Sequence, residues 1–437
     1  MAIAHPELTI HLLCTSGPDK GQFLEVGSTE ITIGQAPSNL KDSGVADKHA
    51  AFWWTGQGLH FRGLPGCFLI INAVPVHEGI LVRGQQFVLG SSIWQVGTTS
   101  VSATHVMESL MSRLNRLAST DKLEGFSLKE MFSEVFKKRT HEEIEEYFIV
   151  GTSKTTPPIT EVQTGWPKPW FFTRVLLFTA IIYFGFSYAM DQFLNENLVP
   201  GLIMMGSLAV PLATVFLFFE LNSPRNVSFL DVLMLVAFGG VVSLFVSLIG
   251  FNIAHLNWLG ASSAGIVEEI GKLLAVVLIV RKPRYKYILN GMLFGAAVGA
   301  GFAAFESAGY AFRELLNQNF DISAMSDVIR LRAFLTPFGH VAWTAIAAGA
   351  LWRAKGDRNI TPATFTDQKF LKAFLIPVLL HMIWNSPLPS PYHILQLALG
   401  VIGWFVVFGL VQQGLYQVRD EQIQIARSRL AEISASA

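Results

Sequence analysis

Residues 261–280 read ASSAGIVEEIGKLLAVVLIV, an apolar run that carries three charged side chains, Glu268, Glu269 and Lys272, near its middle. About 20 mostly apolar residues are enough for a helix to cross the hydrocarbon core of a bilayer. Charged side chains in such a helix are costly unless they face other polar groups, and they usually mark a functional position. This stretch therefore predicts a membrane-spanning helix that faces a polar site.

Apolar segments of similar length surround this run. Across the chain of 437 residues, 51% are hydrophobic and 15% are charged, whereas soluble domains have about 25% charged residues. We predict an α-helical, polytopic membrane domain of about eight transmembrane helices over residues 170–417. The predicted spans lie near 170–190, 199–219, 229–250, 261–280, 288–312, 334–352, 370–386 and 393–416.

Basic residues divide unevenly between the two sets of loops that join these spans. The loops opposite the termini carry only Arg313, Arg330 and Arg332, all between the fifth and sixth spans. The positive-inside rule therefore places both termini in the cytoplasm and predicts a multi-pass protein of the cell (inner) membrane. The loops and tail on the side of the termini carry Arg225, Arg281, Lys282, Arg284, Lys286, Arg353, Lys355, Arg358, Lys369, Arg419, Arg427 and Arg429.

Ionisable side chains from four predicted spans fall at one depth. Glu268, Glu306, His340 and His381 each lie five to seven residues from the outer end of a span. At about 1.5 Å per residue, this places them roughly 8–11 Å below the outer boundary, so we expect them to share one site. Residues at helical spacing are expected to support that site, namely Lys272, Phe302, Thr344 and Asn385.

Three functions are open for this group of residues. In a purely structural role, the histidines and the Glu–Lys pair would only satisfy each other inside the bundle. A transporter or channel would use the carboxylates as a proton or cation path, but such proteins usually have inverted repeats of broken helices, and the two halves show no convincing match. Hydrolysis by carboxylate-activated water uses all of these groups and is the favoured prediction.

The N-terminal part has a different pattern. Short alternating segments such as LTIHLLC (8–14) and SIWQVG (92–97), separated by Gly, Pro, Asn and Asp, predict an all-β sandwich. Apolar residues that recur every three or four positions predict amphipathic helices within 104–147. The expected parts are a cytoplasmic sandwich (1–100), amphipathic helices and a linker (101–169), the membrane domain (170–417) and a cytoplasmic tail (418–437).

Charge limits the partners of these parts. The formal net charge is zero, so the composition does not support binding to nucleic acid. The basic run Lys137-Lys138-Arg139 is either a solvated face or a contact with anionic lipid headgroups. The bilayer itself is the one partner that the apolar spans require.

Four motifs in the predicted spans resemble those of the PrsW family of intramembrane proteases, over roughly residues 170–416. The related CAAX-processing branch would have an arginine and a histidine where this chain has Leu273 and Glu306, which favours the PrsW type. The motifs read Glu268-Glu269-x-x-Lys272, Phe302-x-x-x-Glu306, His340-x-x-x-Thr344 and His381-x-x-x-Asn385.

The resemblance implies cleavage of a single-pass membrane protein, such as an anti-sigma factor, near the outer face of the bilayer. Glu268 or Glu269 would act as general base on a water molecule. His340 and His381, with Asn385, would bind that water or stabilise the oxyanion. Lys272, Phe302 and Thr344 would support these groups.

A metal-dependent version is also open. Glu306, His340 and His381 would form a suitable zinc set, with a glutamate as the base. The sequence does not decide between the two versions, and we expect no permanent metal.

The N-terminal part is similar to the forkhead-associated (FHA) β-sandwich. Segments ITIGQAPSN (31–39), VADKHAAF (45–52), INAVPV (71–76) and LVRGQQFVLG (81–90) match that family's conserved segments. Phosphothreonine binding in the family uses an arginine and a serine at positions that are Gln35 and Ala46 here, whereas the loop histidine is present as His49. Without the arginine and the hydroxyl, a phosphate loses its main charge-assisted contacts. We therefore expect an FHA-like fold that binds a cytoplasmic protein partner or self-associates, with phosphopeptide binding lost.

Overall fold

The computed structural model describes residues 10–38, 40–55, 58–72, 74–82, 84–97, 114–115, 117–120, 123, 125–280 and 285–436. It divides into two compact units, Met1–Ser109 and Leu110–Ala437. The first part of the segment 104–147, predicted to form amphipathic helices, lies outside the described residues, as do the basic residues Arg281, Lys282 and Arg284.

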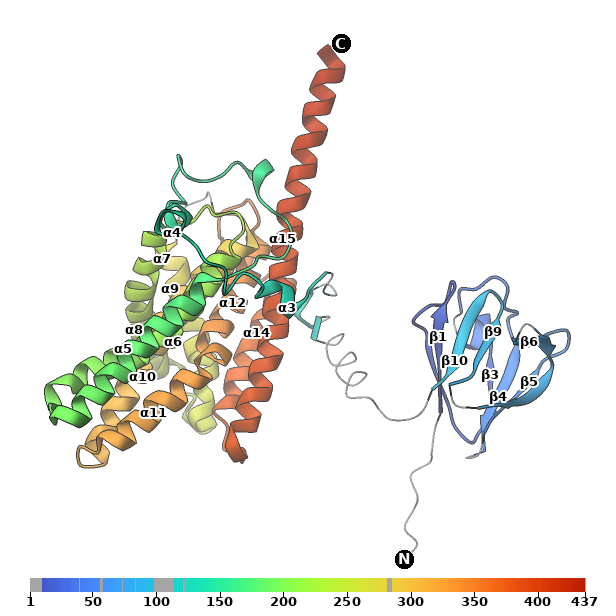
Figure 1. Ribbon diagram of the computed structural model, residues 1–437, viewed down its shortest axis with the longest axis horizontal. Coiled ribbons are helices and arrows are strands. Elements are labelled where there is room, and N and C mark those ends of the chain that lie inside the picture. Colours follow the sequence, from blue (N-terminus) through green and yellow to red (C-terminus); the bar gives the residue numbers. More distant parts are fainter. Residues whose placement is uncertain are drawn as a thin grey trace, which may run out of the picture. The chain divides into compact units, whose positions relative to one another are not determined.

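The first unit is a sandwich of two antiparallel sheets (Figure 1). One sheet has the strand order β2-β1-β10-β9-β6-β7, and the other has the order β3-β4-β5-β8. The predicted all-β fold is therefore confirmed. The strands are β1 (Ile10–Ser16), β2 (Phe23–Val26), β3 (Ile31–Ile33), β4 (Ala50–Trp54), β5 (Leu59–Gly63), β6 (Leu69–Ile71), β7 (Val74–Val76), β8 (Glu78–Leu81), β9 (Gln86–Leu89) and β10 (Ser92–Val96), with the short helix α1 (Gln35–Ser38) after β3.

Aromatic side chains fill the space between the two sheets. Phe52 on β4 is directly opposite Phe61 on β5, and its ring centroid lies 6.1 Å from that of Phe61 and 5.8 Å from that of Phe87 on β9. All three side chains are buried, as is Trp94 on β10. Successive residues of a strand point to opposite faces, so the alternating pattern of the sequence produces this core.

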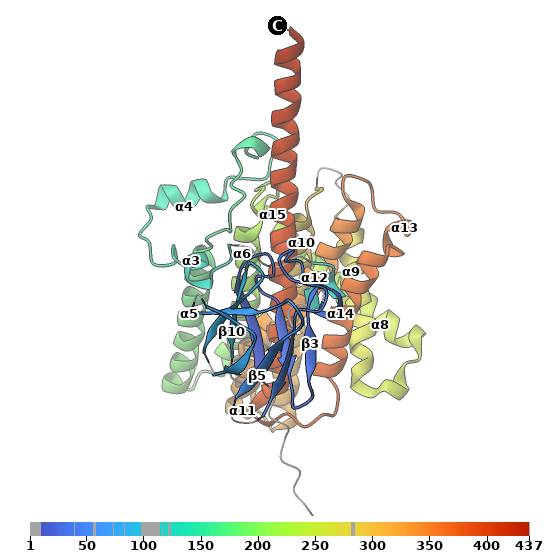
Figure 2. The ribbon, with the colours of Figure 1, turned by 90° about the vertical axis from the view of Figure 1, so that its right-hand side faces the viewer.

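The second unit is a bundle of long helices (Figures 1 and 2). In the most apolar 18-residue stretch of the central helix, α10, 94% is buried inside the bundle. The corresponding share for α5 is only 11%. The helices and helical turns are α3 (Leu128–Met131), α4 (His141–Phe148), η1 (Ile159–Glu161), α5 (Phe171–Phe193), η2 (Glu196–Leu198), α6 (Val199–Leu221), α7 (Phe229–Met234), η3 (Leu235–Gly239), α8 (Gly240–Ala254), η4 (Asn257–Ser262), α9 (Ser263–Ile279), α10 (Ile288–Asn317), α11 (Ile322–Leu335), η5 (Thr336–Phe338), α12 (His340–Lys355), α13 (Pro362–Phe365), α14 (Gln368–Trp384), η6 (Pro391–His393) and α15 (Ile394–Ser436).

Each of the eight predicted spans contains a helix. Within the described residues, six helical segments are long and apolar enough to cross a membrane. Helices α9 and α14 are not among the six, because each has only 17 residues and carries polar side chains. Residues 322–335, predicted as part of an outer loop, form α11, and α15 continues without a break from the eighth span into the predicted tail.

Helices α10 and α12 pack closely against each other at the centre of the bundle. Gly295 and Gly299 of α10 lie against the backbone carbonyls of Thr344 and His340, where a methyl group would collide. Small residues allow two helices to pack with their backbones in near contact. Gly265 of α9 packs in the same way against α14. These contacts bring the four helices that carry the predicted polar residues together.

Candidate active site within the helical bundle

A fully buried ion pair on α9 forms the centre of the site. Lys272 Nζ lies 2.5 Å from Glu269 Oε1, and His381 Nδ1 of α14 lies 2.9 Å from the same oxygen. Glu268, which the sequence spacing pairs with this lysine, is 4.0 Å from Nζ, so Glu269 is the closer partner. Leaving either charge of a buried pair without its partner is strongly destabilising, so each charge requires the other.

His340, at the first position of α12, is held at both ring nitrogens. Lys272 Nζ lies 3.0 Å from Nδ1, and Nε2 lies 3.0 Å from Glu306 Oε2 on α10. An ammonium group only donates hydrogen bonds, so Nδ1 accepts and Nε2 carries the proton donated to Glu306. The Phe302 ring packs 4.6 Å from Lys272 Nζ and 5.1 Å from the imidazole centroid. His340 is thus a neutral imidazole in one fixed orientation.

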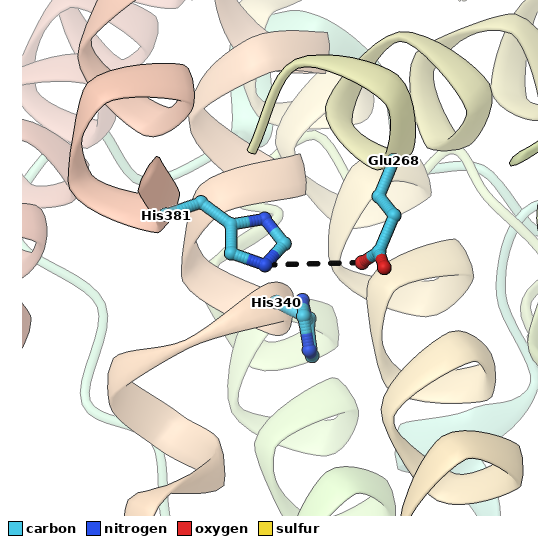
Figure 3. Close-up of side chains that lie close together, drawn as sticks. All are labelled: Glu268, His340 and His381. Atoms are coloured by element: carbon cyan, nitrogen blue, oxygen red, sulfur yellow. Dashed lines mark ion pairs between the residues drawn. The ribbon is translucent and has the colours of Figure 1, made fainter. Parts of the chain in front are cut away.

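His381 and Glu268 face each other across a gap (Figure 3). Because His381 donates its Nδ1 hydrogen to Glu269, its Nε2 is left as an acceptor. That nitrogen lies 3.8 Å from Glu268 Oε2, a buried oxygen with no hydrogen-bond partner among the described residues. Buried acceptors are normally satisfied, so these two atoms call for a shared donor, such as a water molecule admitted from the adjoining cavity, or for a cation.

A cavity of about 490 Å³ opens onto this gap. Of the two adjacent glutamates, Glu268 lines the cavity, whereas Glu269 is fully buried behind it. The indole of Trp343 forms part of the wall and stacks 4.6 Å from the His381 ring. The polar side chains that line the cavity include Glu268, Glu306, Ser307, Tyr310, Arg332, Thr336, His340, His381, Asn385, His393 and Gln396.

Arg332 of α11 is a site residue that the sequence reasoning missed. Its Nη2 lies 2.5 Å from Glu306 Oε2, and its Nε donates to Ser307 Oγ at 2.9 Å. Its guanidinium also packs 4.4 Å from the Tyr310 ring. The signal is the helical spacing of apolar Ile322, Met325 and Ile329, of which Met325 and Ile329 are buried and Ile322 is partly buried. This spacing indicates a helix where a loop is predicted.

The predicted catalytic residue Asn385 and the predicted supporting residue Thr344 differ in their placement. Asn385 ends α14 and lines the cavity beside His381. Thr344 is buried, and its hydroxyl donates to the His340 carbonyl at 2.8 Å, inside α12. Thr344 is not among the residues that line the cavity, so it stabilises the first turn of α12 and the position of His340.

One group of residues that could hold a metal ion shares two members, His340 and His381, with the set expected from the sequence. Among the described residues, ligand atoms of Glu268, His340 and His381 lie within 4.8 Å of one another, whereas Glu306 is outside this group. Zn²⁺ takes such ligands at about 2.0–2.2 Å, so a small adjustment would let them surround one ion. The unpartnered Glu268 Oε2 and the free His381 Nε2 suit this role. His340 would first have to release Lys272 or Glu306.

In the sandwich, the loop that resembles a phosphopeptide site is held by internal hydrogen bonds. The Gln35 side chain donates to the Asp42 carbonyl at 2.8 Å. His49 Nδ1 accepts from the Ala46 backbone at 3.1 Å, and its Nε2 lies 3.0 Å from the Phe68 carbonyl. His49 thus fixes the loop, and the Gln35 amide is already engaged.

Comparison with known proteins identifies two relationships. Residues 227–411 match the family described as PrsW family intramembrane metalloprotease. No curated protein is matched. Among solved structures, the chain is similar to an FHA domain studied for phosphothreonine-dependent interactions (24% identity, 21% of this chain and 99% of that one, TM-score 0.19). It is also similar to FHA domains from Chlamydia trachomatis (16%, 21% and 99%, 0.20) and Arabidopsis thaliana (18%, 24% and 98%, 0.21).

Proposed function

Since its helical domain is PrsW-like over residues 227–411, we propose that this protein is an intramembrane endopeptidase whose reacting water is activated by Glu268. One observation carries the proposal. Two acceptors without a donor between them, Glu268 Oε2 and His381 Nε2, face each other at a cavity inside the helical bundle. A water molecule placed there donates to both atoms and keeps a lone pair for attack on a carbonyl carbon.

The proposed reaction is hydrolysis of a peptide bond. The water oxygen attacks the carbonyl carbon while Glu268 takes one water proton. The amide of Asn385, which lines the cavity, is available as a donor to the oxyanion. Collapse of the tetrahedral intermediate breaks the C–N bond, and Glu268 returns the proton to the leaving nitrogen. The products are a carboxylate and an amine.

The remaining charged residues act through these groups. Glu269 holds the His381 tautomer and pairs with Lys272, which in turn donates to His340. Arg332 and Glu306 hold the opposite side of His340. We assign them as positioning residues because their hydrogen bonds go to the imidazoles or to one another, and none of these bonds goes to the gap between Glu268 and His381.

The residues present also fit a metal-dependent form. Glu268, His340 and His381 would hold the ion, and a bound zinc ion would supply Lewis-acid activation of water. The contact of Glu269 with His381 and that of Arg332 with Glu306 would be kept in this form, whereas His340 would exchange its contact with Lys272 or Glu306 for the ion.

The proposed substrate is a single-pass membrane protein cut near the outer face of the inner membrane, with both termini of this chain in the cytoplasm. The sandwich is proposed to bind a cytoplasmic protein partner. Because Gln35 and Ala46 replace the phosphate-binding arginine and serine of the FHA family, we expect no measurable phosphothreonine-peptide affinity in calorimetry. Tight binding of such a peptide would contradict this part.

Co-expression with a panel of single-pass membrane proteins tests the function. Wild type should produce shortened products that vanish in Glu268→Gln, and the matched variant Glu314→Gln, on α10 but away from the cavity, should still cleave. If no protein is cleaved, and proton or cation flux into liposomes depends on Glu268, a transporter explains the site instead.

A further inference from the structure

The segment of residues 132–139, which we name the interfacial loop, is attached to the first turn of α5. Arg174 of α5 donates to the Lys137 carbonyl at 3.0 Å. The Phe132 ring lies 5.7 Å from that of Phe172, and the Arg139 guanidinium lies 4.3 Å from the Trp170 ring. Helix α3, which precedes the loop, lies beside this end of α5 (Figures 1 and 2). The loop is therefore level with the start of the first span.

Helix α5 presents an apolar surface to the outside of the bundle. Leu177, Phe178 and Ile181 are 62%, 65% and 70% exposed. Its 23 residues, at about 1.5 Å each, give a length of roughly 34 Å, close to the roughly 30 Å of a hydrocarbon core. A lipid-facing helix of this length starts at the boundary of that core, so the interfacial loop lies at the headgroups.

The loop has the chemistry of a membrane surface contact. Phe136 is 94% exposed, and the neighbouring Lys137 and Lys138 are exposed as well. The Glu134 carboxylate forms ion pairs with both Lys137 (3.2 Å) and Arg139 (2.8 Å), so one carboxylate faces two cations. The hydrogen bond from Lys137, with the charges of Lys137, Arg139 and Lys168, lowers the pKa of Glu134. Within the interfacial loop, the basic residues therefore outnumber the single acidic residue, and they lie next to the exposed ring of Phe136.

We propose that the interfacial loop docks on anionic phospholipid headgroups, with Phe136 inserted at the boundary and Lys137 and Lys138 facing the phosphates. Basic residues at an anionic surface each add favourable binding free energy that salt screens. An exposed aromatic ring adds apolar contact at the same depth. The loop is attached to the first turn of α5, a helix with an exposed apolar face of membrane-spanning length, which favours the bilayer as its occupant. Docking would fix the segment between the sandwich and the first span on the membrane.

The test uses the full chain in lipid nanodiscs. An environment-sensitive fluorophore is attached at Ser133→Cys, an exposed loop position, in a Cys14→Ser/Cys67→Ser background. Nanodiscs contain phosphatidylcholine alone or an equal mixture with phosphatidylglycerol. We expect a blue shift in the anionic discs that decreases at high salt and disappears in Lys137→Gln/Lys138→Gln.

Two further variants complete the test. The pair Lys20→Gln/Lys48→Gln, on the sandwich surface, removes the same charge and should keep the shift. Phe136→Ser should reduce the shift in anionic discs without changing the size-exclusion profile. Equal emission in both lipids, or a shift that survives Lys137→Gln/Lys138→Gln, would overturn the proposal and point to solvent or a protein partner as the occupant.

Discussion

Among the carboxylates of the site, hydrogen bonding and cavity lining separate the one that we propose to be reactive from the ones that we propose to be structural. Glu269 accepts from Lys272 and His381, and Glu306 accepts from Arg332 and His340. Glu268 and Glu269 each have one buried Oε2 without a hydrogen-bond partner among the described residues, but only Glu268 lines the cavity. Adjacent glutamates on one helix turn therefore have different surroundings, because side chains about 100° apart on a helix meet different neighbours, and we propose different roles for them.

The two glutamates should respond differently to the same substitution. Glu269→Gln leaves the fully buried Lys272 ammonium without its counter-charge, which costs about 3–5 kcal/mol. Glu268→Gln removes a carboxylate that holds no short contact, so stability should change little while cleavage is lost. Thermal unfolding in detergent measures the effect of each substitution on stability, and a cleavage assay on the same variant measures its effect on activity. Equal melting temperatures for both variants would contradict the assignment.

Arg332 provides a second test at this scale. Arg332→Gln removes a charge-assisted hydrogen bond to Glu306, worth about 1.5–3 kcal/mol, so the cleavage rate should fall about 10- to 100-fold. Arg332→Lys should restore part of the rate, since it keeps the charge. The control is Arg330→Gln on the same helix, whose partner is the exposed Asp327. A rate equal to wild type in Arg332→Gln would exclude the positioning role.

At the scale of elements, the packing of α10 against α12 sets the position of His340. Both helices are apolar enough to be predicted from sequence, and their polar residues fall at one depth. The contact itself depends on Gly295 and Gly299, which let the backbones approach. The rotation of each helix then decides which side chains meet.

A pair of glycines on α10 tests this contact. In Gly299→Ala the new methyl group meets the His340 carbonyl, and such overpacking costs about 1–3 kcal/mol. In Gly309→Ala the methyl group meets nothing within 4 Å. Alanine has the higher helix propensity, so this variant should be more stable than wild type by up to about 1 kcal/mol. Thermal unfolding should show opposite shifts, and activity should fall only in Gly299→Ala. A stable, active Gly299→Ala protein would refute the close contact.

The sequence predicted the elements better than the partners within the site. Length and apolarity locate the spans, and alternation locates the sandwich strands, because both patterns depend only on local chemistry. Arg332 was missed because it enters the site from a helix whose packing no local pattern reveals. The group that could hold a metal contains Glu268, whereas the predicted set contains Glu306. Sequence alone does not give this detail, since side-chain direction depends on how neighbouring helices are rotated.

At the scale of the whole molecule, the chain consists of two units with separate cores. The sandwich has its own core of aromatic and aliphatic side chains, so its stability can be measured without the helical unit. Its buried Asp42 accepts from Ser92 Oγ at 2.8 Å and from the Ser91 backbone at 2.7 Å. Burial raises the pKa of Asp42, but these hydrogen bonds and that from Gly44 outweigh it, so the pKa is lowered.

This shift predicts the acid response of the sandwich. A carboxylate with a lowered pKa in the folded state stabilises that state above its unfolded pKa, about 3.9. The contribution is lost as the pH falls through the folded pKa. In acid titrations of residues 1–109 followed by tryptophan fluorescence, Asp42→Asn should weaken the loss of stability below about pH 4. The exposed control Asp47→Asn should titrate like wild type, and an Asp42→Asn curve identical to wild type would contradict the prediction.

The most direct test of the central claim is the cleavage rate of one identified substrate by purified protein in proteoliposomes, with Glu268 or Gln at position 268 and equal amounts of folded protein. In water enriched in oxygen-18, the wild-type product should carry one labelled oxygen at its new carboxyl end. Loss of a general base lowers rates about 10²- to 10⁴-fold, so Glu268→Gln should be slower by at least about 100-fold. A Glu268→Gln protein that cleaves at the wild-type rate would contradict the account.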